Sequence, residues 1–236
     1  MQRNLRSIAL VCGVLSLSSC WPNTAPIGSQ RHDSRSVELD SSERVRVELN
    51  MRFGELNVRG GAQKLLDADF TYNMAAWKPD LRYRSGAGIG DLTVEQHGST
   101  TSRGDSTNRW DLRFNDNLPL DLNVQLGAGE GRLDLGSLRL SSVDIQMGAG
   151  TLRLDLRGAP KKDYSVHVRG GVGEATVYLP NDIGISATAS GGIGDISVTG
   201  LRKSGDRYVN DAEARSGVRI RLDIQGGVGS IKLIAE

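Results

Sequence analysis

A short glycine motif that recurs seven times constrains this chain more than any other feature. In each copy a glycine follows an apolar or small residue, and an alternating run follows the glycine; the motif glycines are Gly54, Gly90, Gly129, Gly150, Gly173, Gly194 and Gly229. From Gly129 to Gly194 the three successive steps are 21, 23 and 21 residues long. A motif repeated at nearly constant spacing indicates one small β unit stacked on itself.

The residues around the motifs alternate between apolar and polar side chains. Val45, Val47 and Leu49, for example, are separated by charged residues. Period-two alternation indicates β-strands that bury one face, and the chain has no clear helical period. We therefore predict an all-β fold, a single-stranded β-solenoid (β-helix) with rungs of about 21 residues and glycine-rich corners. A β-sandwich with glycine-rich hairpin turns shares the alternation and is the alternative.

The predicted role of the glycines is to turn the chain where rungs crowd together. Stacked strands lie about 4.8 Å apart, and glycine accepts both positive φ and close backbone approach. The residue before each motif glycine is predicted to fill the solenoid interior; these residues are Phe53, Ile89, Ala128, Ala149, Val172, Ile193 and Val228.

The N-terminus has the order of an export signal. Arg3 and Arg6 precede a short apolar run, which ends at Leu17-Ser18-Ser19-Cys20 and resembles the lipobox of bacterial lipoproteins. This resemblance predicts a signal peptide over residues 1–19 and lipidation of Cys20, with an ordinary signal peptide as the alternative. Residues 20–43 are predicted to be a flexible, lipid-anchored tether. Trp21 favours the outer membrane if the cell is Gram-negative.

Composition excludes several classes of function. Lys and Arg total 29 against 28 Asp and Glu, so the net charge of +1 gives no electrostatic case for nucleic acid. The only other cysteine, Cys12, lies in the predicted signal peptide. His32, His97 and His167 lack the spacing of a metal site or a catalytic triad. We expect no catalytic residue, no metal and no cofactor. Motif carboxylates such as Asp195 are interpreted as solvated, with calcium binding as the alternative.

One face of the predicted repeats is a candidate interaction surface. Arg132 and Asp134 align with Arg153 and Asp155 one repeat later, and Tyr178 follows in the next repeat. These side chains form either a solvated face with weak ion pairs or a flat strip that binds a glycan or protein partner.

The motif sequences resemble the toast-rack family of bacterial envelope proteins. The resemblance is carried by Phe53-Gly54-Glu55-Leu56, by Leu126-Gly127-Ala128-Gly129-Glu130-Gly131 and by Met147-Gly148-Ala149-Gly150-Thr151-Leu152. Residues 44–125 are similar to its N-terminal domain, and residues 126–236 to LiaF-type and adhesin-like C-terminal repeats, which are expected to be continuous with the first domain. The resemblance implies a β-solenoid, an extracytoplasmic location and no established activity.

These observations together predict a non-catalytic cell-envelope lipoprotein that acts as a scaffold, an adhesin-like domain or a stress-response interaction domain. A polysaccharide-binding or polysaccharide-active β-helix is the alternative. The expected partners are the membrane, through the lipid on Cys20, and an unidentified envelope protein or glycan. Self-association is expected at the end of the solenoid, where Ile231 to Ile234 are predicted to form an exposed edge.

Overall fold

The protein is an all-β molecule, as predicted, and its strands join in one mixed sheet. The computed structural model describes residues 28–98 and 106–236, which form fourteen strands and one 3-10 turn, η1 (Ala75–Trp77). The long strands are β2 (Arg44–Arg59), β7 (Leu120–Asp134), β8 (Leu140–Asp155), β9 (Tyr164–Leu179) and β14 (Arg219–Ala235). The shorter strands are β1 (Arg31–Val37), β3 (Leu66–Tyr72), β4 (Pro79–Gly86), β5 (Ile89–Gln96), β6 (Asn108–Phe114), β10 (Gly184–Ile193), β11 (Ile196–Thr199), β12 (Arg202–Ser204) and β13 (Arg207–Val209).

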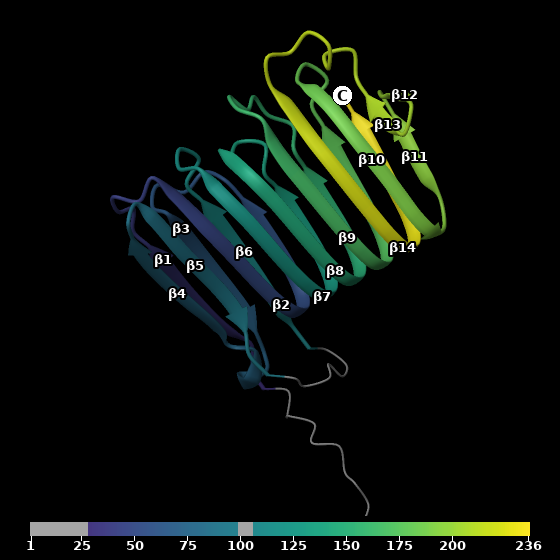
Figure 1. Ribbon diagram of the computed structural model, residues 1–236. Helices are drawn as coiled ribbons and strands as arrows, with labels where there is room; N and C mark the ends of the chain where they lie inside the picture. The colour runs from purple at the N-terminus through teal and green to yellow at the C-terminus, as the bar shows by residue number, and fades with distance from the viewer. Residues whose placement is uncertain (1–27, 99–105) are drawn as a thin grey trace, which may run out of the picture.

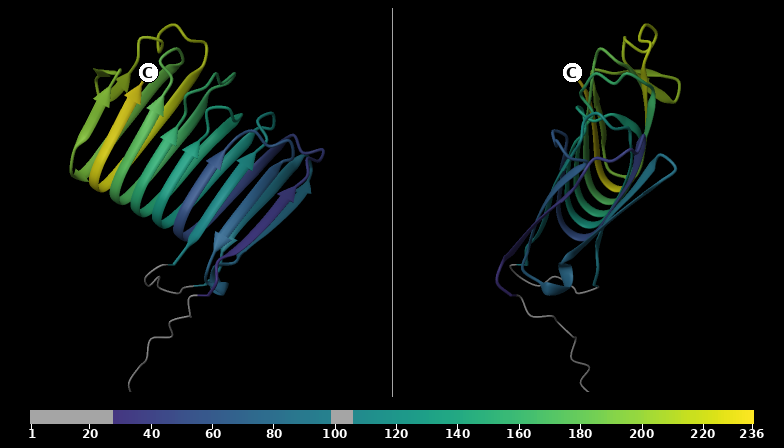
Figure 2. Two further views of the ribbon diagram at one scale, coloured as in Figure 1. Left: turned by 180° about the vertical axis from the view of Figure 1, so that it is seen from behind. Right: turned by 90° about the vertical axis from the view of Figure 1, so that its left-hand side faces the viewer.

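Each long strand bends near its middle, and the bent strands lie parallel to one another. Figure 1 shows them side by side, and the right-hand view of Figure 2 shows them nested as a row of U shapes. Leu122 of β7 pairs with Val143 of β8, which pairs with Val166 of β9. These pairings reproduce the repeat spacing predicted from the glycine motifs.

Six of the seven motif glycines form a column at the bend. Gly54, Gly129, Gly150, Gly173, Gly194 and Gly229 have φ angles of 134°, 134°, 130°, 138°, 134° and 135°. A Cβ added to Gly129 would lie 1.9 Å from the carbonyl oxygen of Gly54 below it. The bend therefore requires glycine twice over, for its φ and for the close contact between neighbouring strands.

Gly90 does not belong to this column, so its assignment as a corner glycine is wrong. It lies within β5, where it pairs with Val45 of β2. The turn nearby is the β4–β5 hairpin, in which Ala87 and Gly88 have φ angles of 51° and 76°. A tight hairpin needs positive φ just as the bend does, which explains why the two local sequences look alike.

The predicted inward position of the residue before the motif glycine is also wrong in the last three motifs. Val172, Ile193 and Val228 are 57%, 71% and 47% exposed. Inward side chains stop at Met147 in β8 and resume at Leu152, and the residues between them are not buried. The bend interrupts the alternation of the strand, so these apolar side chains lie on its outer surface.

The core fills the space between the two arms of the bent strands. Its members alternate along every long strand; among them Val47, Leu49, Leu122, Val143, Leu154, Val166, Leu222 and Leu233 are at most 2% exposed. At the N-terminal end Trp110 packs edge-on against Phe70, with ring centroids 5.7 Å apart. Trp110 and Phe114 are fully buried, as expected for core packing.

The N-terminal strands correct the extent of the predicted tether. β1 lies inside the predicted tether of residues 20–43 and pairs along its whole length with β3 in antiparallel register. The tether assignment is therefore wrong for residues 31–37, which form a strand although their polar sequence did not predict one. The predicted signal peptide, Cys20 and residues 21–27 lie outside the described residues. The predicted domain boundary at residue 125 falls within β7, which pairs with β2 on both sides of its bend.

The C-terminal strand lies inside the sheet, which overturns the prediction that Ile231 to Ile234 form its edge. β14 runs parallel to β9 on one side and parallel to β10 and β11 on the other. Gly229 accordingly stacks on Gly173, and Gly194 stacks on Gly229. After β11 the chain forms the β12–β13 hairpin and then returns as β14, which lies between β9 and β10 (Figure 1).

Candidate functional site

The side chains that were predicted to form an interaction face lie in a regular array on the outer side of the second arm. Arg132 pairs in register with Arg153, and Asp134 with Asp155, which pairs with Tyr178. The rows continue toward the N-terminus, where Asn57 lies beside Arg132 on one side and Asp111 on the other. We call the surface made by Arg132, Asp134, Arg153, Asp155 and Tyr178 with their neighbours Glu55, Asn57, Arg109, Asp111, Glu130 and Arg157 the charged face.

Opposite charges on the charged face neutralise one another. The Arg132 guanidinium contacts the Glu55 carboxylate and also lies 2.7 Å from an oxygen of Glu130. Arg109 Nε donates to Asp111 at 2.9 Å, and Asp111 accepts from Asn57 Nδ2 at 3.0 Å. Exposed ion pairs of this kind each contribute about 0–1 kcal/mol to stability. The pairs hold the side chains flat along the sheet rather than adding much to its stability.

Tyr178 forms a second cluster with two arginines. The guanidinium carbons of Arg153 and Arg157 lie 4.3 Å and 4.9 Å from its ring centroid, and Arg153 Nη1 donates to its hydroxyl oxygen at 2.9 Å. Arg157 also donates from Nε to Asp155 at 2.9 Å. Partial burial raises the pKa of the Asp155 carboxyl, but the hydrogen bonds from Arg157 outweigh it, and the net pKa is lowered. Asp155 therefore stays ionised and fixes Arg157 against the ring.

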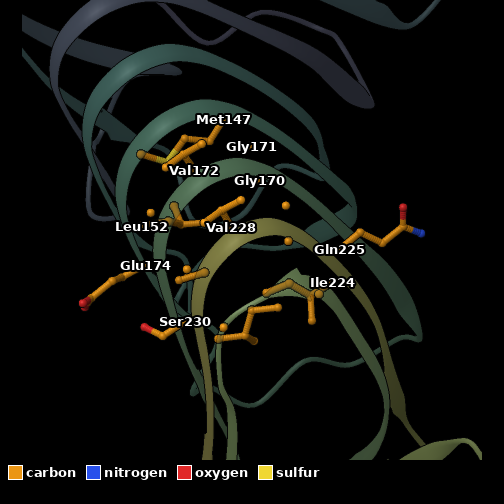
Figure 3. Close-up of a pocket in the computed structure, with 18 of the residues that line it drawn as sticks. Met147, Leu152, Gly170, Gly171, Val172, Glu174, Ile224, Gln225, Val228 and Ser230 are labelled. Carbon is orange, nitrogen blue, oxygen red and sulfur yellow. The ribbon is translucent and has the colours of Figure 1, made fainter.

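The apolar cavity beneath the bend is too small for a drug-sized ligand. The cavity beneath the bend, lined by apolar side chains such as Met147, Leu152 and Ile224, has a volume of about 40 Å³ (Figure 3). A drug-sized ligand needs about 300–1,000 Å³. In Figure 3 Glu174 and Gln225 point away from this cavity on opposite sides of the bend.

An open groove runs along the outside of the first arm, next to the bend. Its volume is about 850 Å³. Asn50, Gln125, Gln146 and Arg169 lie in one row across it, each paired in register with the next. This row was not predicted from the sequence. Its signal in β2, β7 and β8 was a polar side chain one position before the last inward residue of the first arm.

Two buried amides close the N-terminal end of this groove, beside the bend of β2, where β5 ends at Gln96 and β6 begins at Asn108. Gln96 Oε1 accepts from the backbone nitrogen of Arg52 at 2.9 Å, and Asn108 Nδ2 donates to the carbonyl oxygen of Phe53 at 2.6 Å. Asn108 Nδ2 also donates to Gln96 Oε1 at 3.1 Å. These side chains provide the hydrogen bonds that a neighbouring backbone provides elsewhere in the sheet.

The three histidines do not meet. His32 contacts Thr71, His97 lies 3.4 Å from Asp80, and His167 lies 3.9 Å from Asp223. Over residues 28–98 and 106–236 there is no group of three or more His, Cys, Asp or Glu side chains that would hold a metal ion. The same part of the chain contains no helix long and apolar enough to cross a membrane.

Comparison with known proteins agrees with this architecture. The N-terminal domain of toast_rack matches residues 26–178, and the C-terminal domain of LiaF, a cell wall-active antibiotics response protein, matches residues 129–233. The chain belongs to the toast-rack family. The crystal structure of a "putative cell adhesion protein" from Clostridium sporogenes matches this toast-rack protein with 32% identity and a TM-score of 0.86, over 88% of this chain and 100% of that one.

More distant comparisons add nothing to the argument. A "putative adhesin" from Bacteroides fragilis matches 87% of this chain and 98% of its own, with 10% identity and a TM-score of 0.28. No curated protein matches. The family relationship indicates a protein of the cell envelope or surface, and no catalytic family is indicated.

Proposed function

We propose that this protein is a non-catalytic, lipid-anchored component of the cell envelope, whose charged face binds an extended envelope partner. In this proposal residues 1–19 are a signal peptide, Cys20 carries the lipid, and the sheet is a β-solenoid in which each turn contributes one bent strand. The protein serves as a scaffold in an adhesin-like or stress-response role, in keeping with the names of the proteins that it resembles.

The observation that carries this proposal is the regular, flat charged face. Arg132, Arg153 and Tyr178 lie on consecutive parallel strands and present polar groups at the strand spacing. A repeat surface of this kind suits an extended partner, because contacts recur along its length. The internal neutralisation of Arg132 by Glu55 and Glu130 favours a partner of mixed charge over a strongly charged polymer.

Photo-crosslinking in intact cells tests this proposal. A photoreactive residue in place of Thr176, which lies between Arg153 and Lys232 on the charged face, should capture one defined envelope component. The same residue in place of Asp144, on the opposite arm, is the matched control. The charge reversal Arg153→Glu should abolish capture from position 176 without changing the melting temperature. Equal capture from both positions, or capture that Arg153→Glu leaves unaltered, would contradict the role of the charged face.

The lipid anchor has its own test. Cys20→Ser should release the protein from the membrane fraction and abolish incorporation of labelled fatty acid. Continued labelling of this variant would show that Cys20 is not the lipidated residue.

Polysaccharide binding is the second candidate function, and the groove on the first arm favours it. Side-chain amides such as those of Asn50, Gln125 and Gln146 both donate and accept hydrogen bonds, as sugar hydroxyls require. The three side chains lie in one row on neighbouring strands, which matches a linear glycan better than a single sugar.

A glycan array separates the two functions. The double variant Gln125→Ala with Gln146→Ala should lose the signal if the groove binds glycans, whereas Arg153→Glu on the charged face should retain it. A parent protein that binds no glycan on the array, and releases no sugar from cell-wall fractions, would remove this candidate.

A further inference from the structure

The sheet ends at its C-terminal side in an edge that lacks a partner strand over most of its length. Within the described residues, β13 pairs with only Ser186 and Ala187 of β10, and β11 pairs only with β14. The outer edge is therefore unpaired from Thr188 to Thr199, on both arms of the last bend. Figure 1 shows β10 and β11 at this end of the sheet, with the short β12–β13 hairpin beside them.

The hydrogen bonds of the described residues show which backbone groups point outward from this edge. The Gly184 nitrogen donates to the Val218 oxygen on the β14 side at 3.1 Å, whereas the Ile185 nitrogen donates to Asn210 Oδ1 on the other side at 3.0 Å. Because ladder groups alternate along a strand, the backbone groups of Ala189 and Gly191 also point outward.

The same reasoning applies to β11. The Asp195 oxygen accepts from the Ile231 nitrogen of β14 at 2.9 Å. The next residue, Ile196, and then Val198 therefore present their N–H and C=O groups to the outside. Each arm of the last bend thus carries two residues whose backbone hydrogen bonds face away from the sheet.

This edge lacks the protection found at the other end of the molecule. Edge β1 carries the charged pair Asp33 and Arg35, and edge β4 begins with Pro79 and carries Arg82 and Arg84. From Thr188 to Thr199 the only charged residue is Asp195, and Ile193 and Ile196 are 71% and 38% exposed. Charges and proline on an edge strand prevent sheets from joining, and a neutral apolar edge invites it.

We propose that this edge pairs with the same edge of a second copy of the chain, in antiparallel register about a two-fold axis through the bend. The first arm of one copy then lies against the second arm of the other. Gly191 faces Ile196, and Ala189 faces Val198, so that outward backbone groups meet outward backbone groups on both arms. A two-fold arrangement of this kind closes on itself and gives a dimer rather than a fibre.

The side chains fit the same register. Ala189 and Val198 pack against the core in each copy, so their pairing extends the dry interior from one copy into the next. Ser190 faces Ser197 on the outside, and both are uncharged. The β12–β13 hairpin covers only Ser186 and Ala187, which places it beyond the paired segment. The charged strands at the N-terminal edge lack uncharged side chains in this register. We therefore take the pairing partner to be the C-terminal edge of a second copy.

Disulfide trapping of the full chain in its native membrane tests the register. Ser190 and Ser197 occupy a non-hydrogen-bonded pair, whose short Cα separation suits a disulfide. Ser190→Cys combined with Ser197→Cys should yield a covalent dimer under mild oxidation. Either single variant, and the out-of-register combination of Ser190→Cys with Thr199→Cys, should give no more dimer than the parent. Absence of the in-register dimer, or equal yields from the two double variants, would overturn the proposal.

A charge pair tests the association without a covalent bond. Ser190→Glu with Ser197→Glu places like charges opposite one another twice in the dimer, whereas Ser190→Lys with Ser197→Glu places opposite charges there. Both variants carry the same Glu beside Lys232 of β14, so they differ only at position 190. Sedimentation of the full chain in a nonionic detergent should show at least a tenfold weaker dimer for the Glu/Glu variant and a retained dimer for the Lys/Glu variant. A monomeric parent, or two variants of equal affinity, would overturn the proposal.

Discussion

Replacement of Gly173 by alanine is the sharpest test of the glycine column. Gly173 lies at the bend of β9 with a φ of 138°, and a Cβ added there would lie 1.8 Å from the carbonyl oxygen of Gly150. That oxygen belongs to the backbone of β8, which β7 and β9 hold on both sides. The contact therefore cannot be relieved by the rotation of a side chain.

Two costs add in this variant. A non-glycine residue forced into this region of φ costs about 1–3 kcal/mol. Displacing a packed strand to make room for an extra methyl group costs about 1–3 kcal/mol more. The sum of about 2–6 kcal/mol is a large part of the 5–15 kcal/mol that stabilises a typical domain. At about 2–4 °C per kcal/mol for a domain of this size, the melting temperature should fall by roughly 5–20 °C.

Gly170→Ala in the same strand is the matched control. Its added Cβ has no neighbour closer than 3.9 Å, and its φ is outside the left-handed region. This variant should change stability by less than about 1 kcal/mol. Far-ultraviolet circular dichroism during heating and in urea measures both variants. If Gly173→Ala and Gly170→Ala melt together, the reasoning about the bend is wrong.

Two further substitutions test individual side chains. Asn210→Ala removes an amide that accepts from the Ile185 nitrogen at 3.0 Å and donates to the Ile183 oxygen at 2.6 Å. Because these buried groups lose their partners, the free energy of unfolding measured in urea should fall by about 1–3 kcal/mol. Asp155→Asn should destabilise the protein at neutral pH, and this loss should shrink as the pH falls below about 4. The stabilisation by a carboxyl with a lowered native pKa is complete above its unfolded pKa of about 3.9 and is lost as the pH falls toward the native pKa. A difference between parent and Asp155→Asn that stays constant from pH 7 to pH 3 would contradict this assignment.

The repeat could be read from the sequence because the physics of the bend is local. At Gly129, Gly150 and Gly173 the positive φ and the close backbone contact both require glycine, so each bend is marked by a glycine in the sequence. The alternation of apolar residues likewise marks the inward face of every long strand. The same local rule misled at Gly90, because a hairpin turn leaves an identical trace.

The order of the last strands could not be read in this way. The step from Gly173 to Gly194 matches the repeat, yet Gly229 lies between the two in the column. Each bent strand here has the same inward alternation and the same glycine, so any of them fits beside any other. The segment from Gly200 to Val218 determines the order, because its hairpin brings the chain back to the position between β9 and β10. No local sequence pattern predicts that return.

The charged face shows the same division between local and distant causes. The rows of Arg132 with Arg153 and of Asp134 with Asp155 follow from the repeat spacing alone. The neutralisation of Arg132 by Glu55 does not, because these residues lie 77 positions apart and meet only through the pairing of β2 with β7. The sequence allowed weak ion pairs on this face, and the pairing of distant strands determines which charges meet.

Deletion of residues 217–236 tests whether β14 lies inside the sheet or at its edge. A terminal edge strand would leave the remaining stack intact when removed, whereas β14 supplies the parallel partner of β9 on one side and of β10 and β11 on the other. In a repeat array each unit depends on its neighbours, so the amides of β10 and β11 should lose hydrogen-exchange protection while those of β7 and β8 keep theirs. A peptide of residues 217–236 added to the truncated chain should restore the protection by refilling the place. Full protection of β10 and β11 without the peptide would mean that β14 is dispensable and that its central position does not organise the C-terminal end.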